Sequence, residues 1–294
     1  MNQKASVRAA LAGLFLIALA ASSGCGPRRV LGPGQGDLHV DAATDLDARA
    51  EYVKRDPVRY LRDVEKRTEQ LQQYTLTLTR QERRGLFPTL RDPERIMAWY
   101  RREPFSIRFK WIDPGVKYGE STYVRGLNGN KVRFVPRHGL FGLPPGITSV
   151  ELQTPVTWGE ARYPVTDFGL ERMLERTLDS IRESRGDYII EYRGLRTLDN
   201  GAVTHHLWMK FPPSKHVAPV QELFVDARTD LPVLTLIKRE SGDLEAAYLY
   251  EDVNTSVRLT DDDFLLEIER RAGSTAAEAP AGDAPSPPTG ARTG

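Results

Sequence analysis

The sequence predicts an α+β protein: one antiparallel sheet curled into an incomplete half-barrel, with two helices packed on its concave face. Several short segments alternate apolar and polar residues and are separated by Gly, Pro and Asp turns, as in a meandering antiparallel sheet. Two segments carry the apolar stripe of an amphipathic helix. A sheet of this many strands twists too strongly to stay flat, so we expect it to curl around the helices.

The first half of the domain is predicted to hold one helix followed by strands. The helix is expected within residues 56–73, because Asp56 can cap it and Pro57 suits its first turn. One face of this helix is apolar and consists of Val58, Leu61, Val64 and Leu71. The strands are expected at residues 74–82, 94–102, 104–112, 121–127 and 131–137. Asn128-Gly129 predicts a tight type I′ turn before the last of them.

The second half repeats the order of helix and strands after an apolar, turn-rich segment at 138–166. A helix is expected within 166–183, with Thr166 or Asp167 as its cap. Its apolar stripe consists of Leu170, Met173, Leu174, Leu178 and Ile181. Strands are then expected at residues 187–194, 203–211, 220–227, 232–240 and 244–253.

Both ends of the chain differ in composition from a packed core. The first residues combine a basic start with a charge-free apolar run, which is the layout of a secretory signal. The low-periodicity stretch after it is typical of a tether, and the Ala/Pro/Gly-rich end is typical of disorder. We therefore expect a signal peptide at 1–24, a flexible tether at 25–50, the half-barrel domain at 51–271 and a disordered tail at 272–294.

Cys25 is the single cysteine, so it cannot form an intrachain disulfide. It follows Ser22, Ser23 and Gly24, and this junction resembles the lipobox of bacterial lipoproteins, with Ser22 in the usual place of leucine. The resemblance implies cleavage before Cys25 and acylation, and several acyl chains anchor a protein durably. The alternative is an ordinary signal with an incidental cysteine. Gly26 stands where enterobacterial lipoproteins of the inner membrane carry aspartate, which favours the outer membrane.

Charge and motifs argue against nucleic-acid binding, catalysis and metal binding. The formal net charge is +1 and becomes −1 without the signal, so no nucleic-acid partner is expected. There is no Gly-x-Ser-x-Gly, His-Glu-x-x-His or phosphate-loop motif, so we expect no enzyme and no cofactor. His205 and His206 project to opposite faces of a predicted strand and cannot easily share a metal. The acidic run 261–263 lacks calcium-loop spacing, and Thr260 with Asp263 predicts a cap instead.

The aromatic and aliphatic residues of the strands are the remaining unusual feature. One interpretation is a cavity for an acyl chain, lined by Trp99, Phe105, Ile107, Phe109, Trp111, Leu207 and Met209. The other is a core that the two helices close completely. Leu140, Phe141 and Leu143 are interpreted as a lid over this cavity, as a contact with a bilayer, or as a loop tucked into the core. Basic residues on the same strands either meet lipid phosphates or form a solvated face; they are Arg108, Lys110, Lys131, Arg133 and Arg137.

The end of the domain resembles the LolA/LolB-like superfamily of periplasmic lipoprotein carriers. The matching positions of its strand, turn and closing loop are Asp226, Thr229, Leu231, Pro232, Asn254 and Phe264. Residues 104–111, 118–134 and 163–174 resemble more closely a bacterial envelope family known as a domain of unknown function, DUF1571. Together the similarities span roughly residues 55–265. The resemblance implies a half-barrel with a hydrophobic cavity.

These observations predict a monomeric, periplasm-facing envelope protein that is held to a membrane through acylated Cys25. Its expected function is non-enzymatic binding of a lipid, a lipoprotein or another hydrophobic ligand in the half-barrel. The alternative is an interaction or scaffold protein with a filled core. Because carriers of the superfamily are soluble, the expected anchor favours an acceptor, envelope-stress or scaffold role over a shuttling one.

Overall fold

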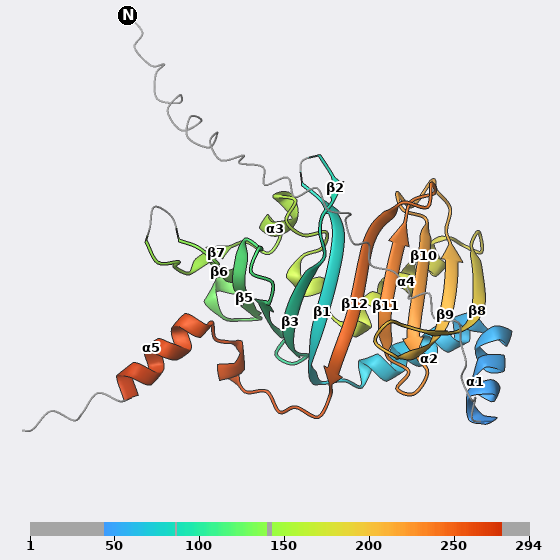
Figure 1. The fold of residues 1–294 in the computed structure, drawn as a ribbon, viewed down its shortest axis with the longest axis horizontal. Helices are drawn as coiled ribbons and strands as arrows, with labels where there is room; N and C mark the ends of the chain where they lie inside the picture. The colour runs from blue at the N-terminus through green and yellow to red at the C-terminus, as the bar shows by residue number, and fades with distance from the viewer. Residues whose placement is uncertain (1–43, 86, 140–142, 278–294) are drawn as a thin grey trace, which may run out of the picture.

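Strands dominate the structure, a computed structural model that describes residues 44–85, 87–139 and 143–277. Within these residues, twelve strands form one open antiparallel sheet (Figure 1). In chain order they are β1 (Gln73–Arg84), β2 (Thr89–Leu90), β3 (Glu94–Arg101), β4 (Ser106–Trp111), β5 (Tyr118–Val124), β6 (Val132–Pro136), β7 (Thr148–Val150), β8 (Ile189–Thr197), β9 (Val203–Lys210), β10 (Val220–Asp226), β11 (Pro232–Lys238) and β12 (Leu244–Asn254). The predicted fold class is confirmed.

The two halves of the chain meet at the centre of the sheet. The spatial order is β7-β6-β5-β4-β3-β1-β12-β11-β10-β9-β8, and β2 pairs with β1 alone. β1 therefore joins the first half to the second through β12, in a register that runs from Thr75 opposite Asn254 to Glu82 opposite Ala246. Almost every other neighbour in the sheet is also a neighbour in sequence, which is a meander on each side of β1.

Helices accompany the sheet, and two of them cover its concave face. Those described are α1 (Thr44–Arg55), α2 (Pro57–Glu69), α3 (Thr154–Thr157), α4 (Leu170–Glu183) and α5 (Glu267–Ala277). α2 and α4 lie against each other behind the sheet in the view of Figure 1. Their buried apolar side chains, such as Leu61 and Leu174, join one core with concave-face residues such as Leu76 and Leu207. Both predicted helices are confirmed.

The two helices begin differently. Asp56 caps α2 as predicted, because its Oδ1 accepts a hydrogen bond from the Arg59 amide at 2.9 Å. The predicted cap of α4 is wrong: Thr166 and Asp167 lie in a 3₁₀ turn, and Gly169 precedes the helix with a φ of 144°. The Leu170 amide instead donates to the Tyr74 hydroxyl of β1 at 3.0 Å. A tertiary contact thus replaces the local cap.

The β5–β6 connection is longer than the predicted two-residue turn. It spans residues 125–131, and Asn128, Gly129 and Asn130 all have positive φ. The loop is closed by the Asn130 side chain, whose Oδ1 accepts from the Gly126 amide at 2.7 Å. Asn-Gly therefore marked the place of the turn, but the Asn130 side chain sets a wider loop than type I′ needs.

The ends of the described chain extend beyond the expected domain. α1 begins at Thr44, inside the range expected to be a tether, and contacts α2 and β8. α5 ends at Ala277, inside the range expected to be a tail. No helix of the described part is long and apolar enough to cross a bilayer. The expected signal at 1–24 and Cys25 lie outside the described residues.

Candidate ligand-binding cavity on the concave face

A cavity of about 150 Å³ lies between the concave face of the sheet and the segment that follows α3. The sheet contributes side chains from β1, β3 to β7 and β12, and residues 155–169 form the opposite wall. Aromatic rings dominate the lining and come from both walls: Phe109, Trp111, Tyr118, Phe134, Trp158 and Phe168. Aliphatic side chains complete it, among them Leu78, Ile96, Val132 and Val150. Such a lining is typical of a site for an apolar ligand.

The 155–169 wall is fixed to the β1–β2 hairpin by a close backbone contact. The Gly85 amide donates to the Gly159 carbonyl at 3.1 Å, and Gly159 has a φ of 69°. A Cβ on Gly159 would lie 3.1 Å from the Gly85 Cα, so the approach requires glycine. Arg84 Nη1 adds a bond of 2.6 Å to the Glu160 carbonyl. The cavity is thus built by contacts between segments far apart in sequence.

Two of the seven side chains expected to line a cavity do so. Phe109 and Trp111 face the cavity, and Phe109 meets Phe168 with ring centroids 5.0 Å apart. Four others are buried in the packed core and do not line it: Phe105, Ile107, Leu207 and Met209. The concave face therefore divides into a packed part under the helices and a hollow part under residues 155–169.

Trp99 lies on the opposite face of the sheet. Ala98, not Trp99, is opposite Phe109 in the β3–β4 register, whereas Trp99 is opposite Arg108. The Arg108 guanidinium carbon stands 4.5 Å from the centre of the Trp99 ring, a cation–π contact. Successive strand residues face opposite sides, so Trp99 and Phe109 cannot share the cavity.

Of the three residues interpreted as a lid, Leu140 and Phe141 lie outside the described residues. Leu143 is described and is 68% exposed. The cavity wall is instead supplied farther along the chain by the segment that includes Trp158, Tyr163 and Phe168. Its apolar, turn-rich composition was the available signal, but composition gives no indication of which face such a segment covers.

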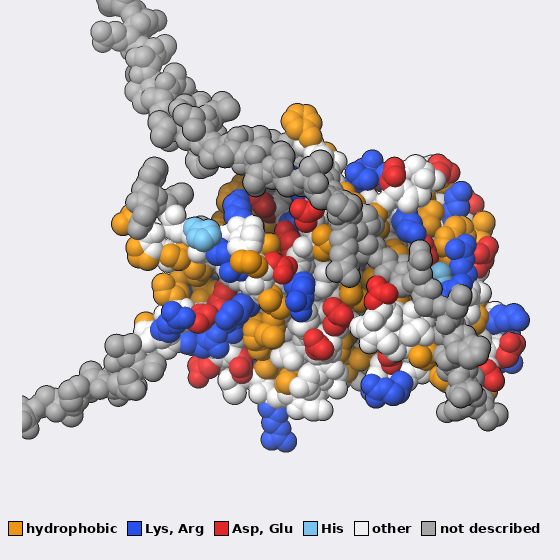
Figure 2. Space-filling model, in the orientation of Figure 1, with side chains coloured by type: hydrophobic (Ala, Val, Ile, Leu, Met, Phe, Trp, Pro, Cys, Tyr) orange, Lys and Arg blue, Asp and Glu red, His pale blue; other side chains and the backbone are white. Residues whose placement is uncertain are grey.

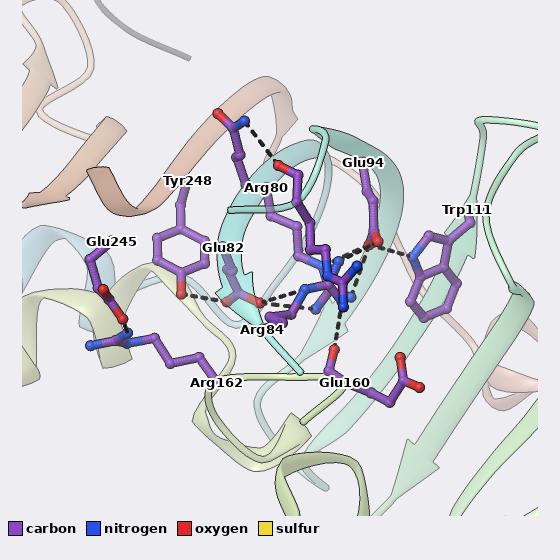
Figure 3. Close-up of polar contacts among 11 residues, drawn as sticks. Arg80, Glu82, Arg84, Glu94, Trp111, Glu160, Arg162, Glu245 and Tyr248 are labelled. Carbon is purple, nitrogen blue, oxygen red and sulfur yellow. Dashed lines mark hydrogen bonds and ion pairs between the residues drawn. The ribbon is translucent and has the colours of Figure 1, made fainter. Parts of the chain in front are cut away.

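Paired charges form the wall of the cavity nearest the centre of the sheet (Figure 3). Arg80 Nη2 donates to Glu94 Oε2 at 3.0 Å, and Arg84 also pairs with Glu94. Arg84 and Arg80 flank buried Glu82, which accepts from the Tyr248 hydroxyl at 2.6 Å. Burial opposes ionisation of Glu94, but the two guanidinium groups outweigh it and lower its pKa. Each charge here has a partner of opposite sign.

A second cavity of about 250 Å³ adjoins the first. The two share four lining residues, Arg162, Tyr163, Arg176 and Tyr248, which form the wall between them. Arg162 is paired, since its Nη1 donates to Glu245 at 2.8 Å. The Arg176 guanidinium stacks on the Tyr163 ring at 4.5 Å. The second cavity then continues beside α4 toward Phe211 and Gln221.

Four of the five basic residues singled out in the sequence pair with acids, and the fifth, Arg137, donates from Nη2 to the Trp111 carbonyl at 2.9 Å. Lys110 pairs with Glu267 at 3.1 Å and Lys131 with Glu151 at 3.1 Å, while Arg133 pairs with Glu269. Figure 2 shows blue and red side chains side by side where α5 meets this part of the sheet. The positive charge of these strands is therefore neutralised locally rather than presented as one basic surface.

His205 and His206 face opposite sides of β9, as predicted. His205 Nδ1 lies 3.0 Å from the Tyr192 hydroxyl on the concave side. His206 Nε2 lies 2.7 Å from Glu222, and its ring stacks on Phe224. In the described part of the chain, no three His, Cys, Asp or Glu residues are grouped to hold a metal ion. The predicted Thr260–Asp263 capping box is present.

Comparison with solved structures finds several proteins of low sequence identity. MucB is 16% identical, with 73% of this chain and 64% of that chain covered and a TM-score of 0.45. The Mycobacterium tuberculosis lipoprotein LppX is 12% identical, with 70% and 100% covered and a TM-score of 0.41. A LolA superfamily protein from Nitrosomonas europaea is 11% identical, with 71% and 97% covered and a TM-score of 0.32. This chain spans less than two thirds of the length of MucB.

Sequence comparison gives a family without an assigned activity. No curated protein matches the chain. One family matches residues 71–269, a range that begins just after α2 and includes every strand of the described sheet. Its description is "Protein of unknown function (DUF1571)". The chain belongs to the DUF1571 family, as its sequence motifs predicted.

Proposed function

We propose that this chain is a lipid-anchored envelope protein that binds a hydrophobic ligand, such as an acyl chain of a lipid or lipoprotein, without catalysing a reaction. The observation that carries the proposal is the aromatic cavity between the concave face and residues 155–169. The free energy of the system falls when an apolar ligand replaces water between apolar walls. Rings from both walls, such as Phe109 and Phe168, would hold such a ligand between the sheet and the segment.

The size of the cavity limits what enters. An engineered protein cavity of roughly 150 Å³ takes one benzene-sized molecule, so the first cavity suits a ring or a short length of acyl chain. A longer chain also requires the adjoining cavity, which is about 250 Å³. The linings of the two cavities have Arg162, Tyr163, Arg176 and Tyr248 in common. We therefore propose that a long ligand lies along both.

The polar groups of the cavity support binding rather than chemistry. Arg80, Glu82 and Arg162 are each held by an oppositely charged neighbour. Burial, together with the negative charge of Glu82, raises the pKa of Tyr248 well above its ordinary value, so its hydroxyl stays protonated. Groups held in this way keep the wall rigid.

We propose acylated Cys25 as the anchor, with the outer membrane favoured by Gly26. Intact-mass analysis of the mature protein from its native host is expected to show a chain that begins at Cys25 and carries acyl groups. Treatment with lipase to release acyl chains, compared with an untreated sample, identifies the added mass. An unmodified thiol, or cleavage at another bond, would refute the anchor but would leave the proposal of ligand binding in the cavity unaffected.

A second function, that of an interaction or scaffold protein, is favoured by one specific observation. Four residues expected in the cavity are instead packed in the core, among them Ile107 and Leu207. This part of the concave face is filled by α2 and α4. If binding of a hydrophobic probe is absent, the filled-core function is the one that remains.

Binding of the neutral fluorophore N-phenylnaphthylamine tests the proposal. We expect its fluorescence to rise on addition of the purified domain and to fall when dodecanol competes for the site. Ser121→Phe places a ring among the cavity walls, since Ser121 lies between Phe109 and Phe134 in register. It should weaken probe binding about tenfold or more, because the ring and the probe compete for one volume.

Two further variants make the result interpretable. Val150→Trp fills the same cavity from the edge strand β7, where a folding defect is less expected than in the centre of the sheet. Met97→Phe is the matched control, since Met97 lies on the outer face of β3 and is 39% exposed. Equal probe binding by all four proteins would rule out the cavity as the site.

A further inference from the structure

We infer that the ligand of this cavity is an amphiphile with an anionic head, and that Arg176 binds the head. The inference rests on the proposed function, since it assigns the polar end of the same ligand. It follows from the pairing of the arginines along the cavity wall. Three arginines line the first cavity: Arg80, Arg162 and Arg176.

Two of these three arginines are neutralised by acids of the protein. Arg80 pairs with Glu94 at 3.0 Å, and Arg162 pairs with Glu245 at 2.8 Å. Neither guanidinium therefore offers a free charge to a ligand. The Arg80 pair connects β1 to β3, and the Arg162 pair connects the 155–169 segment to β12.

Arg176 has no such partner. Within the described residues, no carboxylate lies within 4.0 Å of its guanidinium, whose one hydrogen bond runs from Nη1 to the Asp167 carbonyl at 2.9 Å. The Asp167 carboxylate is turned instead toward Arg172, at 3.6 Å. A backbone carbonyl carries only a partial charge, so the positive charge of Arg176 is not balanced at this site.

The side chain of Arg176 is also held in place. Its guanidinium stacks on Tyr163 at 4.5 Å, and the Asp167 carbonyl fixes one edge. A guanidinium has five N–H donors arranged for two parallel bonds to a carboxylate or phosphate. Because the Asp167 carbonyl occupies one edge of the Arg176 guanidinium, the remaining N–H donors are available to an anion.

The position of Arg176 matches the shape of an amphiphile. It lies in the wall between the two cavities, beside Tyr163 and Tyr248, and both cavities include it in their linings. An anionic head bound there would leave its apolar tail free to enter the aromatic volume around Phe109 and Trp111. Carboxylates and phosphates share this chemistry, and a neutral lipid lacks it.

The test compares two fluorophores that differ in one charged group. Anilinonaphthalene sulfonate is N-phenylnaphthylamine with a sulfonate, so the ratio of their affinities measures head recognition. We expect Arg176→Gln to lower the ratio of sulfonate to neutral-probe affinity about tenfold, the usual scale of a lost charge-assisted hydrogen bond. Arg176→Lys should keep much of the preference. Arg182→Gln is the matched control, an exposed arginine on the same helix α4 that does not line the cavity.

Competing ligands distinguish a carboxylate head group from a phosphate head group. Dodecanoate, dodecyl phosphate and dodecanol have the same tail, and we expect at least one of the two anions to displace the sulfonate probe more strongly than dodecanol. The stronger anion identifies the head as carboxylate or phosphate. Equal displacement by all three, or an equal loss of both fluorophores in Arg176→Gln, would overturn the inference while the cavity function stands. If wild-type protein binds neither fluorophore, both proposals fail.

Discussion

At the scale of residues, burial determines how titratable groups behave on the concave face. His205 is fully buried beside Tyr60 and Tyr192, and it faces Asp230, Arg49 and Asp226. Burial lowers its pKa to about 4, although the two aspartates act in the opposite direction. The imidazole is therefore neutral in the folded protein at neutral pH. Its neighbour His206 lies on the other face of the sheet, so two adjacent residues lie in different environments.

This shift predicts a pH dependence of stability. The unfolded state takes up a proton near pH 6.5 and the folded state only near pH 4, so protons favour unfolding between these values. The contribution of His205 is complete above pH 6.5 and is lost as the pH falls toward 4. We expect the thermal midpoint of His205→Gln to fall less than that of wild type between pH 7 and pH 4.5. Exposed His138→Gln serves as control and should follow the wild-type curve.

Identifying ring and charge positions from sequence succeeded only in part. Alternation in 104–112 placed Phe109 and Trp111 on the concave face, where the cavity lies. The sequence pattern groups Trp99 with them, although the register of β3 places it on the outer face. The strand at 94–102 carries large residues on both faces, so alternation alone does not show which face lies on the concave side of the sheet. The free charge of Arg176 could not be found from sequence, because it depends on the Asp167 carboxylate turning toward Arg172.

At the scale of elements, α4 is the clearest case of a helix positioned by tertiary contacts. Its first amide, that of Leu170, donates to the Tyr74 hydroxyl at 3.0 Å. Tyr74 stacks on Tyr100, whose hydroxyl in turn contacts Glu171 on the first turn. β1 and β3 thereby fix where the helix starts. No local cap supplies this function, since Gly169 has no side chain.

Removal of one hydroxyl should show this dependence. Tyr74→Phe leaves the buried Leu170 amide without an acceptor, which costs about 1–3 kcal/mol. We expect the free energy of unfolding, measured with urea, to fall by this amount. Tyr188→Phe removes a hydroxyl that makes no hydrogen bond to the described residues, and it should change stability by less than about 0.5 kcal/mol. Equal effects of the two variants would contradict the role of Tyr74.

At the scale of the whole molecule, a buried ion pair attaches the C-terminal segment to the outer face of the sheet. Arg108 is 1% exposed, and its Nη2 donates to Glu120 Oε1 at 3.0 Å. Glu120 Oε2 accepts from the Glu267 amide at 2.9 Å. Thr122 Oγ1 donates to the Phe264 carbonyl at 2.7 Å. Residues 261–267 therefore close over β4 and β5, on the side opposite the cavity.

Breaking this pair should destabilise the whole domain. Arg108→Met removes the nearer cation from the buried Glu120 carboxylate and leaves only half-exposed Lys110, at 4.0 Å, which costs up to roughly 3–5 kcal/mol. Lys110→Met is the matched control on the same strand and face, since that lysine is half exposed and its pairing with Glu267 is worth at most about 1 kcal/mol. Urea unfolding measures both. If the free energy of unfolding falls no more in Arg108→Met than in Lys110→Met, the Arg108–Glu120 pair does not hold residues 261–267 on the sheet.

The sequence by itself determined the long strands, the antiparallel meander and the two amphipathic helices of the concave face, because alternation and helical periodicity are local properties of the chain. Only the tertiary structure decided which part of the concave face is filled and which is hollow. That division depends on the reach of α2 and α4 over the sheet and on the contact that brings Gly159 against Gly85. Ile107 and Phe109 have the same pattern in sequence, yet one is packed and the other lines the cavity. Local periodicity does not distinguish one apolar side chain from another. Whether a cavity remains beside a side chain depends on the elements that pack opposite it.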